Sequence, residues 1–298
     1  MRVSVLVAAL SGVVLATVSA RPLGDQLEAG GNAELWTLDD LDWNADTGEW
    51  TVLVTGATGR TGALVYEALA KTEGVTVRAL VRNVTKAQAK LSCGACGPDE
   101  GVYQASVSHL DELDEAFAGA DAVVILTASY PIKTDDGFVY PEGGYPKDVD
   151  WLGTVNQLKK AQVYGIKSVT LVSSMGTTTP DSFLDKLGDG HALFYKLNAE
   201  ASTMSAGMHY TVIKPCGLTD EASKFASQVG SCDVLKQGKP MHTISRAAVA
   251  QAAVHAAKRE ALNAPSVRFD VCSDPTQPGK TDNWDSLFEQ AAEINVCL

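Results

Sequence analysis

Basic residues are scarce in this chain of 298 residues. Lysine and arginine number 24 against 36 aspartates and glutamates, so the formal net charge is −12 and the sequence pI is about 4.8. A protein with this charge repels the phosphate backbone of DNA and RNA. The composition therefore excludes general nucleic-acid binding, and any phosphate that the protein binds must be held by a local group of residues.

Long hydrophobic runs are missing after the first twenty residues, and internal repeats and a set of metal ligands are missing throughout. No later segment is apolar for long enough to cross a membrane. Cys93 and Cys96 have the spacing of a redox pair or of half a zinc site, but no second cysteine pair or histidine cluster supplies further ligands. We therefore expect no metal, and we expect these cysteines to form a surface disulfide or to remain inert thiols in a loop.

The first twenty residues are typical of a signal peptide. Arg2 precedes an apolar run over residues 3–18, and small residues precede Ala20, after which cleavage is expected. An uncleaved anchor is the alternative, because the run is only slightly short of a bilayer span. The mature chain is then expected in the secretory pathway or outside the cell, or in a plastid that is reached through that pathway. All six cysteines lie in the mature part, where disulfides can form.

Residues 21–49 are expected to form an acidic extension ahead of the folded domain. Between Pro22 and Trp50 the chain carries eight acidic residues and no lysine or arginine. We interpret this segment as solvated, with a role in binding a partner as the alternative. Residues 50–298 are expected to form the folded domain, in which segments from about residue 215 onward shape a pocket.

A β-branched run over residues 51–55 ends directly in three glycines with the spacing Gly-x-x-Gly-x-x-Gly. Gly56 allows the tight turn out of the strand, Gly59 lets backbone N–H groups approach a phosphate, and Gly62 lets the next helix pack on the sheet. A helical pattern and a second strand over 75–81 complete a βαβ unit, and a glycine-rich turn with no ligand is the alternative. The pattern predicts a dinucleotide pyrophosphate at the helix N-terminus. Its expected contacts are Gly56, Ala57, Thr58, Gly59, Arg60, Thr61 and Gly62.

The second strand lacks an acidic residue at its end, where a site that prefers NAD binds the ribose 2′-hydroxyl. Arg82 stands there instead, and Arg60 lies in the glycine loop. A guanidinium matches a 2′-phosphate in charge and in bidentate geometry, so NADP (NADPH) is favoured as the cofactor. Arg82 could otherwise be an ordinary solvated charge, and Arg78 is expected to be solvated rather than bound to a ligand.

A glycosylation sequon at Asn83 adjoins Arg82. A glycan on Asn83 would crowd the adenosine end of the cofactor. Secretion, occupancy of the sequon and cofactor binding at this position therefore cannot all be true.

Strand and helix patterns alternate along the rest of the chain, which predicts an α/β fold with a doubly wound, parallel sheet of the Rossmann type. Further strands are expected at 102–105, 120–127, 168–174, 210–215 and 267–271. Helices are expected at 109–117, 149–163, 246–258 and 284–292, and a long surface loop at 130–145. Since ligands bind beyond the carboxyl ends of such strands, Thr127, Ser173, Ser174 and Pro215 are expected around the same cleft as the glycine loop.

The chain from about residue 50 onward resembles the atypical short-chain dehydrogenase/reductases, specifically the NmrA-like NAD(P)-binding group and its plant-type NADP-binding members. The matching segments are 54–62, 80–82, 145–146, 149–151, 172–176 and 196–200. The resemblance implies a Rossmann core whose smaller C-terminal portion shapes a substrate pocket. It also implies that the glycine loop binds the pyrophosphate, with Arg60 and Arg82 near the adenosine phosphate.

One residue of the wider family's Tyr-x-x-x-Lys pair is missing. The resemblance places Lys196 at the lysine, which in that family binds the nicotinamide ribose and lowers the pKa of the tyrosine for proton transfer. Ala192 stands at the tyrosine position and has no proton to give. His191 and Tyr195 are either alternative donors or pocket-wall and surface residues. Ser174 either polarises a carbonyl or merely ends its strand.

Two functions remain open on this sequence. The first is an NADPH-dependent reductase of a small carbonyl, quinone or alkene, with Lys196 and Ser174 as its catalytic residues. The second is a catalytically silent NADP-binding protein that reports redox state to a protein partner. The first is favoured because the predicted cleft keeps Lys196 and Ser174, and neither the substrate nor the oligomeric state follows from the sequence.

Overall fold

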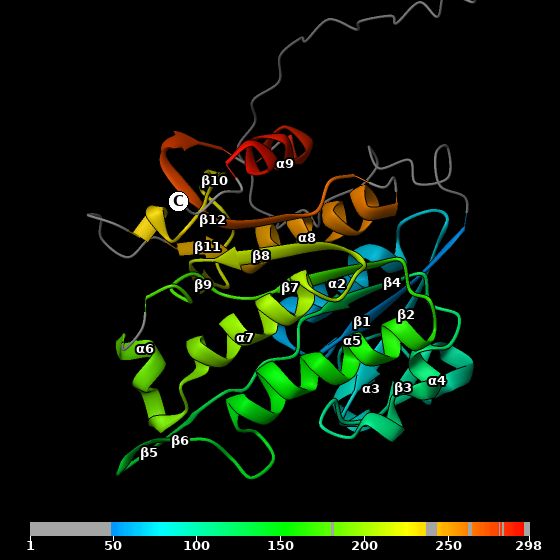
Figure 1. The fold of residues 1–298 in the computed structure, drawn as a ribbon. Coiled ribbons are helices and arrows are strands. Elements are labelled where there is room, and N and C mark those ends of the chain that lie inside the picture. Colours follow the sequence, from blue (N-terminus) through cyan, green and yellow to red (C-terminus); the bar gives the residue numbers. More distant parts are fainter. Residues whose placement is uncertain are drawn as a thin grey trace, which may run out of the picture. The chain divides into compact units, whose positions relative to one another are not determined.

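The computed structural model describes residues 49–179, 182–236, 243–261, 264–279, 281 and 283–294. The predicted signal peptide and residues 21–48 lie outside these ranges. Within the described residues, eight strands form one sheet in the order β10-β12-β8-β7-β4-β1-β2-β3 (Figure 1). They are β1 (Trp50–Thr55), β2 (Val75–Val81), β3 (Val102–Gln104), β4 (Ala122–Ile125), β7 (Ser168–Val172), β8 (His209–Pro215), β10 (Phe225–Gly230) and β12 (Val267–Pro278). All neighbouring strands are parallel except β10 and β12. The predicted fold class is confirmed.

Helices bury both faces of the sheet. Val52 and Val54 of β1 belong to a core cluster with residues of α2 (Arg60–Ala70), α8 (Arg246–Ala261) and α9 (Trp284–Glu293). Leu53 points the other way, into a cluster with residues of α4 (Asp114–Phe117), α5 (Gly153–Val163) and α7 (Ala192–Met204). Figure 1 shows α5 and α7 on the face opposite α8. Strands buried on both faces read as continuous apolar runs, which is why the sequence pattern located them.

Shorter elements connect this framework. Two small sheets pair β5 (Ile132–Thr134) with β6 (Gly137–Val139) and β9 (Gly217–Thr219) with β11 (Thr243–Ser245). The remaining helices are α3 (Val84–Gln88), α6 (Phe183–Lys186), the π-helix η3 (Lys147–Leu152) and the 3₁₀ turns η1 (Pro98–Glu100), η2 (Leu110–Glu112), η4 (Leu187–Asp189) and η5 (Val234–Lys236). No helix within the described residues is long and apolar enough to cross a bilayer.

Several details differ from the sequence prediction. The expected loop at 130–145 contains the β5–β6 hairpin, and the expected helix at 109–117 is split into η2 and α4. The strand expected at 168–174 ends at Val172, so Ser173 and Ser174 lie in the loop that follows it. The last strand continues to Pro278 and pairs with β10, which was not predicted. The sequence of β10, Phe-Ala-Ser-Gln-Val-Gly, shows no clear alternation, and it forms a strand because the long edge of β12 offers it a partner.

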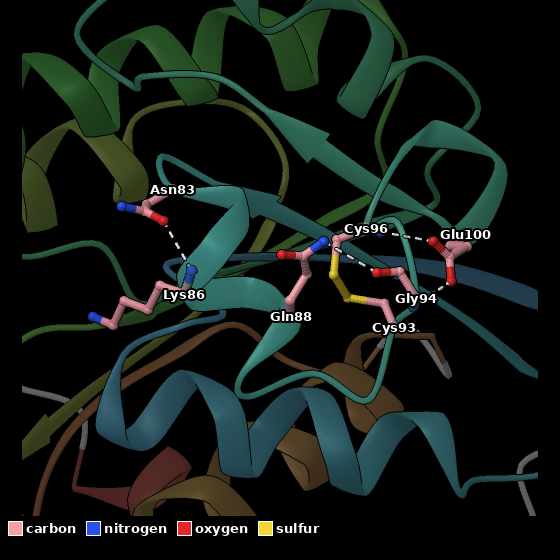
Figure 2. Close-up of a disulfide and its surroundings, with 7 residues drawn as sticks. All are labelled: Asn83, Lys86, Gln88, Cys93, Gly94, Cys96 and Glu100. Carbon is pink, nitrogen blue, oxygen red and sulfur yellow. Dashed lines mark hydrogen bonds between the residues drawn. A yellow bond between two sulfur atoms is a disulfide. The ribbon is translucent and has the colours of Figure 1, made fainter.

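A disulfide joins Cys93 and Cys96 in the loop between α3 and η1 (Figure 2). The Glu100 carboxylate accepts hydrogen bonds from the N–H groups of Gly94 and Cys96, both at 2.7 Å, and Gln88 Nε2 donates to Gly94 O at 3.1 Å. These backbone bonds, with that of Gly94 the strongest, hold the pKa of Glu100 below its usual value. The expected disulfide is therefore present, but its position on the surface is not borne out, because Cys96 is 2% exposed and belongs to the core cluster under α2.

A second disulfide joins Cys216, which directly follows β8, to Cys272 within β12. The residues just before them, Pro215 and Val271, are register partners in the two parallel strands. Cys232 is also disulfide-bonded. The crosslink thus fixes the end of the sheet where the loops that follow the strands gather.

Candidate cofactor and active site

The glycine loop between β1 and α2 leaves no room for side chains at two of its glycines. Gly56 has a φ of +72°, and a Cβ on it would lie 2.7 Å from the carbonyl oxygen of Leu126. A Cβ on Gly62 would lie 2.2 Å from the carbonyl oxygen of Gly56. No side chain caps the helix at Gly59, so the first N–H groups of α2 have no partner within the helix. This uncapped N-terminus is suited to an anion.

A cleft of about 1170 Å³ runs along the carboxyl ends of the parallel strands. All predicted site residues but one line it together: Gly56, Thr58, Gly59, Arg60, Thr61, Gly62, Arg82, Thr127, Ser173, Ser174, Lys196 and Pro215. The exception is Ala57, whose side chain is buried in the core cluster under α2. Leu218, Leu235 and Cys272 from the C-terminal part of the chain also line the cleft.

The arginines near the glycine loop have different partners. Arg60 Nη1 lies 3.1 Å from Asp220 Oδ2, and the same carboxylate binds Arg246 at 2.7 Å. Arg78 turns away from the cleft, where its Nη1 donates to Ala118 O at 2.6 Å and its guanidinium lies over the ring of Tyr103. Arg82 is exposed at the cleft and forms no ion pair within the described residues. Arg82 is therefore the arginine that is available to a ligand.

Two residues beside Arg82 also line this end of the cleft. Lys86 was not singled out from the sequence, where only its spacing of four residues from Arg82 could have signalled it. Asn83, the sequon residue, caps α3 by accepting a hydrogen bond from Lys86 N at 2.8 Å (Figure 2). A glycan on Asn83 would stand at the edge of the cleft, as the sequence argument expected.

Lys196 on α7 forms an ion pair with a carboxylate that the sequence analysis did not assign a role. Its Nζ lies 2.7 Å from Asp150 Oδ1, and Asp150 Oδ2 accepts a hydrogen bond from Ser129 N at 3.0 Å. The π-helix η3 carries Asp150, which is almost fully buried. A buried carboxylate with a charged partner fixes the position of that partner. Asp150 thus orients the Lys196 ammonium at the cleft wall.

The hydroxyls predicted to face the cleft are hydrogen-bonded within the protein. Ser173 Oγ donates to Glu200 Oε1 at 2.5 Å, and Glu200 Oε2 lies 2.7 Å from Arg268 Nη2. Ser174 Oγ donates to Met175 O at 2.9 Å, and Thr127 Oγ1 accepts from Gln157 Nε2 at 3.3 Å. Ser173 therefore serves mainly to hold the loop after β7 onto α7, while Ser174 can reach a ligand only by giving up its bond to Met175.

A buried cluster of charged residues binds the loop that follows β7. Lys214 Nζ lies 3.1 Å from Asp233 and 3.2 Å from Asp270, and its side chain is fully buried. Asp233 also accepts hydrogen bonds from the N–H groups of Gly176 and Thr178. Burial alone would raise the pKa of Asp233, but the bonds from Thr178 and Gly176 and the charge of Lys214 outweigh it and lower that pKa. For Asp270 burial prevails and raises the pKa.

The sequence profile of a family described as NAD(P)H-binding matches residues 56–260, which is more than half of the chain. The chain belongs to this NAD(P)H-binding family. The atypical short-chain dehydrogenase/reductase resemblance is thereby confirmed. The glycine cradle, the uncapped α2 and the available Arg82 fit an NAD(P)H molecule, because they supply the close backbone approach and the positive charge that its phosphates require.

Two plant proteins are similar to this chain in sequence, and one bacterial structure is similar to it in fold. The chain is 33% identical over 268 residues to sanguinarine reductase from Eschscholzia californica. The aligned region covers 80% of this chain and 95% of that enzyme. It is 35% identical over 258 residues to an uncharacterized chloroplastic protein from Arabidopsis thaliana. Here the aligned region covers 83% of this chain and 77% of the relative. The oxidoreductase YlbE from Lactococcus lactis has the same fold, with a TM-score of 0.60, 18% identity and coverage of 83% and 99% of the two chains.

His191 and Tyr195, which the sequence offered as alternative proton donors, do not line the cleft. His191 is the N-cap residue of α7 and has a φ of +48°, and its Nδ1 lies 3.2 Å from Asp185 Oδ2. Tyr195 stacks on Trp151, with ring centroids 6.0 Å apart. Ala192 does line the cleft, where the wider family has its tyrosine.

Proposed function

We propose that this protein is an NADPH-dependent reductase of a carbonyl, quinone or conjugated alkene. The observation that carries the proposal is that one continuous cleft connects the glycine loop with the Lys196–Asp150 ion pair. A cofactor bound at the glycine loop would then reach a fixed ammonium group in the same cavity. The identity to sanguinarine reductase over 95% of that enzyme's length supports a reductase in particular.

NADPH is proposed over NADH because of the charge at the adenosine end. Arg82 and Lys86 line the cleft there, and Arg82 has no ion-pair partner within the described residues. A 2′-phosphate would supply that partner, whereas the hydroxyl of NAD would leave the guanidinium unpaired. Arg60 contributes less, because Asp220 already binds it.

The chain's own residues would position a bound cofactor as follows. The amides that open α2 would bind the pyrophosphate, and Lys196, held by Asp150, would bind the nicotinamide ribose. When bound, NADPH supplies the hydride. Ser174 would hydrogen-bond a substrate oxygen by turning from Met175 O, at the end of the cleft where Lys196 lies.

Six apolar side chains contribute to the lining of the cleft that also contains Lys196. These residues are Met175, Leu184, Leu187, Leu193, Leu218 and Leu235. Such a lining favours a substrate with an apolar body and few polar groups over a highly charged metabolite. An aromatic carbonyl or a quinone fits this chemistry.

A catalytically silent NADP-binding sensor is the second candidate. The observation that favours it is Ala192, which leaves α7 without the hydroxyl that transfers a proton in the wider family. In that case the cofactor would order the fold or alter a surface, and no acceptor would be reduced.

Steady-state oxidation of NADPH separates the two candidates. Purified mature protein is mixed with NADPH and a panel of aromatic aldehydes, quinones and conjugated enones, while fluorescence titration measures NADPH binding. The reductase predicts turnover that Lys196→Ala lowers at least tenfold and that Lys71→Ala, on the outer surface of α2, leaves unchanged. NADPH binding without turnover on any acceptor would favour the sensor.

We infer that the protein acts in a plastid that is reached through the secretory pathway. The signal-like residues 1–20 supply the first part of such an address, and the Arabidopsis relative is described as chloroplastic. A fluorescent fusion to the full-length chain tests this location, and secretion of the fusion into the medium would contradict it.

A further inference from the structure

Tyr140, just after β6, brings a phenol to the start of α7. Its ring packs against Gly190, where an added Cβ would lie 2.1 Å from Cε2 and 2.7 Å from Cζ, the atom that carries the hydroxyl. Gly188 approaches the same ring edge, since its Cβ would lie 3.3 Å from Cε2. The hydroxyl end of the Tyr140 ring therefore lies against Gly190, which precedes Ala192 by two residues.

The Tyr140 side chain is 8% exposed, and it lines the cleft together with Ala192 and Lys196. Its hydroxyl makes no hydrogen bond within the described part of the chain, and it does not belong to the fully buried polar atoms there that lack a partner. The nearest aromatic neighbour, Tyr145, contributes only a tilted ring contact with centroids 5.6 Å apart. An unpaired phenol on the wall of a ligand cleft is available to a ligand.

The surroundings keep this phenol protonated at neutral pH. Burial raises the pKa of Tyr140 first, and the negative charges of Asp150 and Asp185 raise it further. Asp150 is also the ion-pair partner of Lys196. A group that must give a proton to a substrate has to carry that proton before the reaction begins.

We propose that Tyr140 is the proton donor of the reduction and takes the place of the tyrosine that α7 lacks at Ala192. This inference rests on the proposed reductase function. As hydride reaches the carbonyl carbon, the C=O π bond breaks and the oxygen takes the proton from Tyr140, whose O–H bond breaks. A proton from water then restores the phenol from the resulting phenolate. The substrate is reduced by two electrons and NADPH is oxidised to NADP⁺.

The test compares Tyr140→Phe with Tyr145→Phe, which removes a phenol from the neighbouring ring outside the cleft. Tyr140→Phe is expected to lower kcat at least a hundredfold on the acceptor that the wild type uses best, with NADPH affinity within about twofold. Tyr145→Phe is expected to keep kcat within about threefold. Equal urea midpoints for the two variants show that both are folded.

The outcomes separate this proposal from the proposed function. If the wild type turns over an acceptor and Tyr140→Phe keeps that turnover, only the donor role of Tyr140 is overturned. If the wild type oxidises NADPH in the presence of none of the acceptors, the proposed reductase function is overturned, and the donor role of Tyr140 is overturned with it.

A second measurement reads the position of the phenol without turnover. Protein labelled with [¹³Cζ]tyrosine gives one signal for each tyrosine, and the signal absent in Tyr140→Phe belongs to Tyr140. Addition of NADP⁺ is expected to shift that signal, and Asp150→Asn is expected to lower its titration midpoint by removing a nearby negative charge. A Tyr140 signal that NADP⁺ leaves in place would overturn the proposal.

Discussion

The Lys196 ammonium and the Asp150 carboxylate lie 2.7 Å apart on side chains that are 17% and 1% exposed. Because Asp150 is buried and charged, its stability in the fold depends on Lys196 and on the hydrogen bond from Ser129 N. The pair joins α7 to the π-helix η3, and it fixes the one ammonium group that the family resemblance assigns to catalysis.

Asp150→Asn should destabilise the protein by about 1–3 kcal/mol, because it leaves Lys196 without its partner. Urea unfolding measures the change. The matched control is Glu67→Gln, which removes an exposed ion pair with Lys71 on α2 and should change stability by less than about 0.5 kcal/mol. Equal losses for the two variants would contradict the structural role of Asp150.

Gly62→Ala should destabilise the fold and abolish tight NADPH binding. The added Cβ would lie 2.2 Å from the carbonyl oxygen of Gly56, so the loop or the helix must shift, at a cost of about 1–3 kcal/mol or more. Gly97→Ala is the control, since Gly97 has a φ of −109° and nothing lies within 4 Å of its added Cβ. Urea unfolding and fluorescence titration with NADPH are the measurements, and normal binding by Gly62→Ala would refute the close-approach argument.

Arg82→Glu should weaken NADP binding by about 10- to 100-fold and leave NAD binding within about threefold. The reason is that a carboxylate repels a 2′-phosphate, which NAD lacks. Arg78→Gln should leave both affinities unchanged, since the Arg78 side chain bonds to Ala118 O outside the cleft. Calorimetric titration with each cofactor checks this, and an equal loss for NADP and NAD would rule out a 2′-phosphate contact.

Removal of the Cys216–Cys272 disulfide should cost more stability than removal of the Cys93–Cys96 disulfide. The two bridges span 56 and 3 residues, and loop-closure entropy then predicts about 4 and about 2 kcal/mol. In one variant serines replace Cys216 and Cys272, and in the other serines replace Cys93 and Cys96. Urea unfolding measures the free energy of unfolding of both, and each variant is the control for the other. A larger loss from the Cys93–Cys96 pair would show that native contacts, rather than chain entropy, set the difference.

Stability should fall as the pH drops from about 6.5 to about 4 because of His255. Burial, aided by Lys258 and Arg259 and opposed by Asp285, lowers the pKa of His255 to about 4. In this window the unfolded chain binds the proton and the folded chain does not, so the loss amounts to about 3 kcal/mol by pH 4. His255→Gln should remove this part of the pH dependence. Identical pH profiles of unfolding for the variant and the wild type would contradict it.

Local features of this protein could be predicted from the sequence because their causes are local. The residues 51–62 place a strand, a turn and a helix start in direct succession, and the steric demand at Gly62 arises from the Gly56 carbonyl within that stretch. Strands buried on both faces appear as apolar runs. The absence of an acid at Arg82 is likewise a property of a single position.

Pairings between distant segments were decided only by the tertiary structure. Asp150 precedes Lys196 by 46 positions and Tyr140 precedes Gly190 by 50, and no periodicity links either pair. Whether a carboxylate or a phenol is buried, and which group compensates it, depends on how the loops fold over the ends of the strands. The chain by itself therefore determined a nucleotide-binding α/β fold, while packing decided which side chains face the reacting end of the cleft.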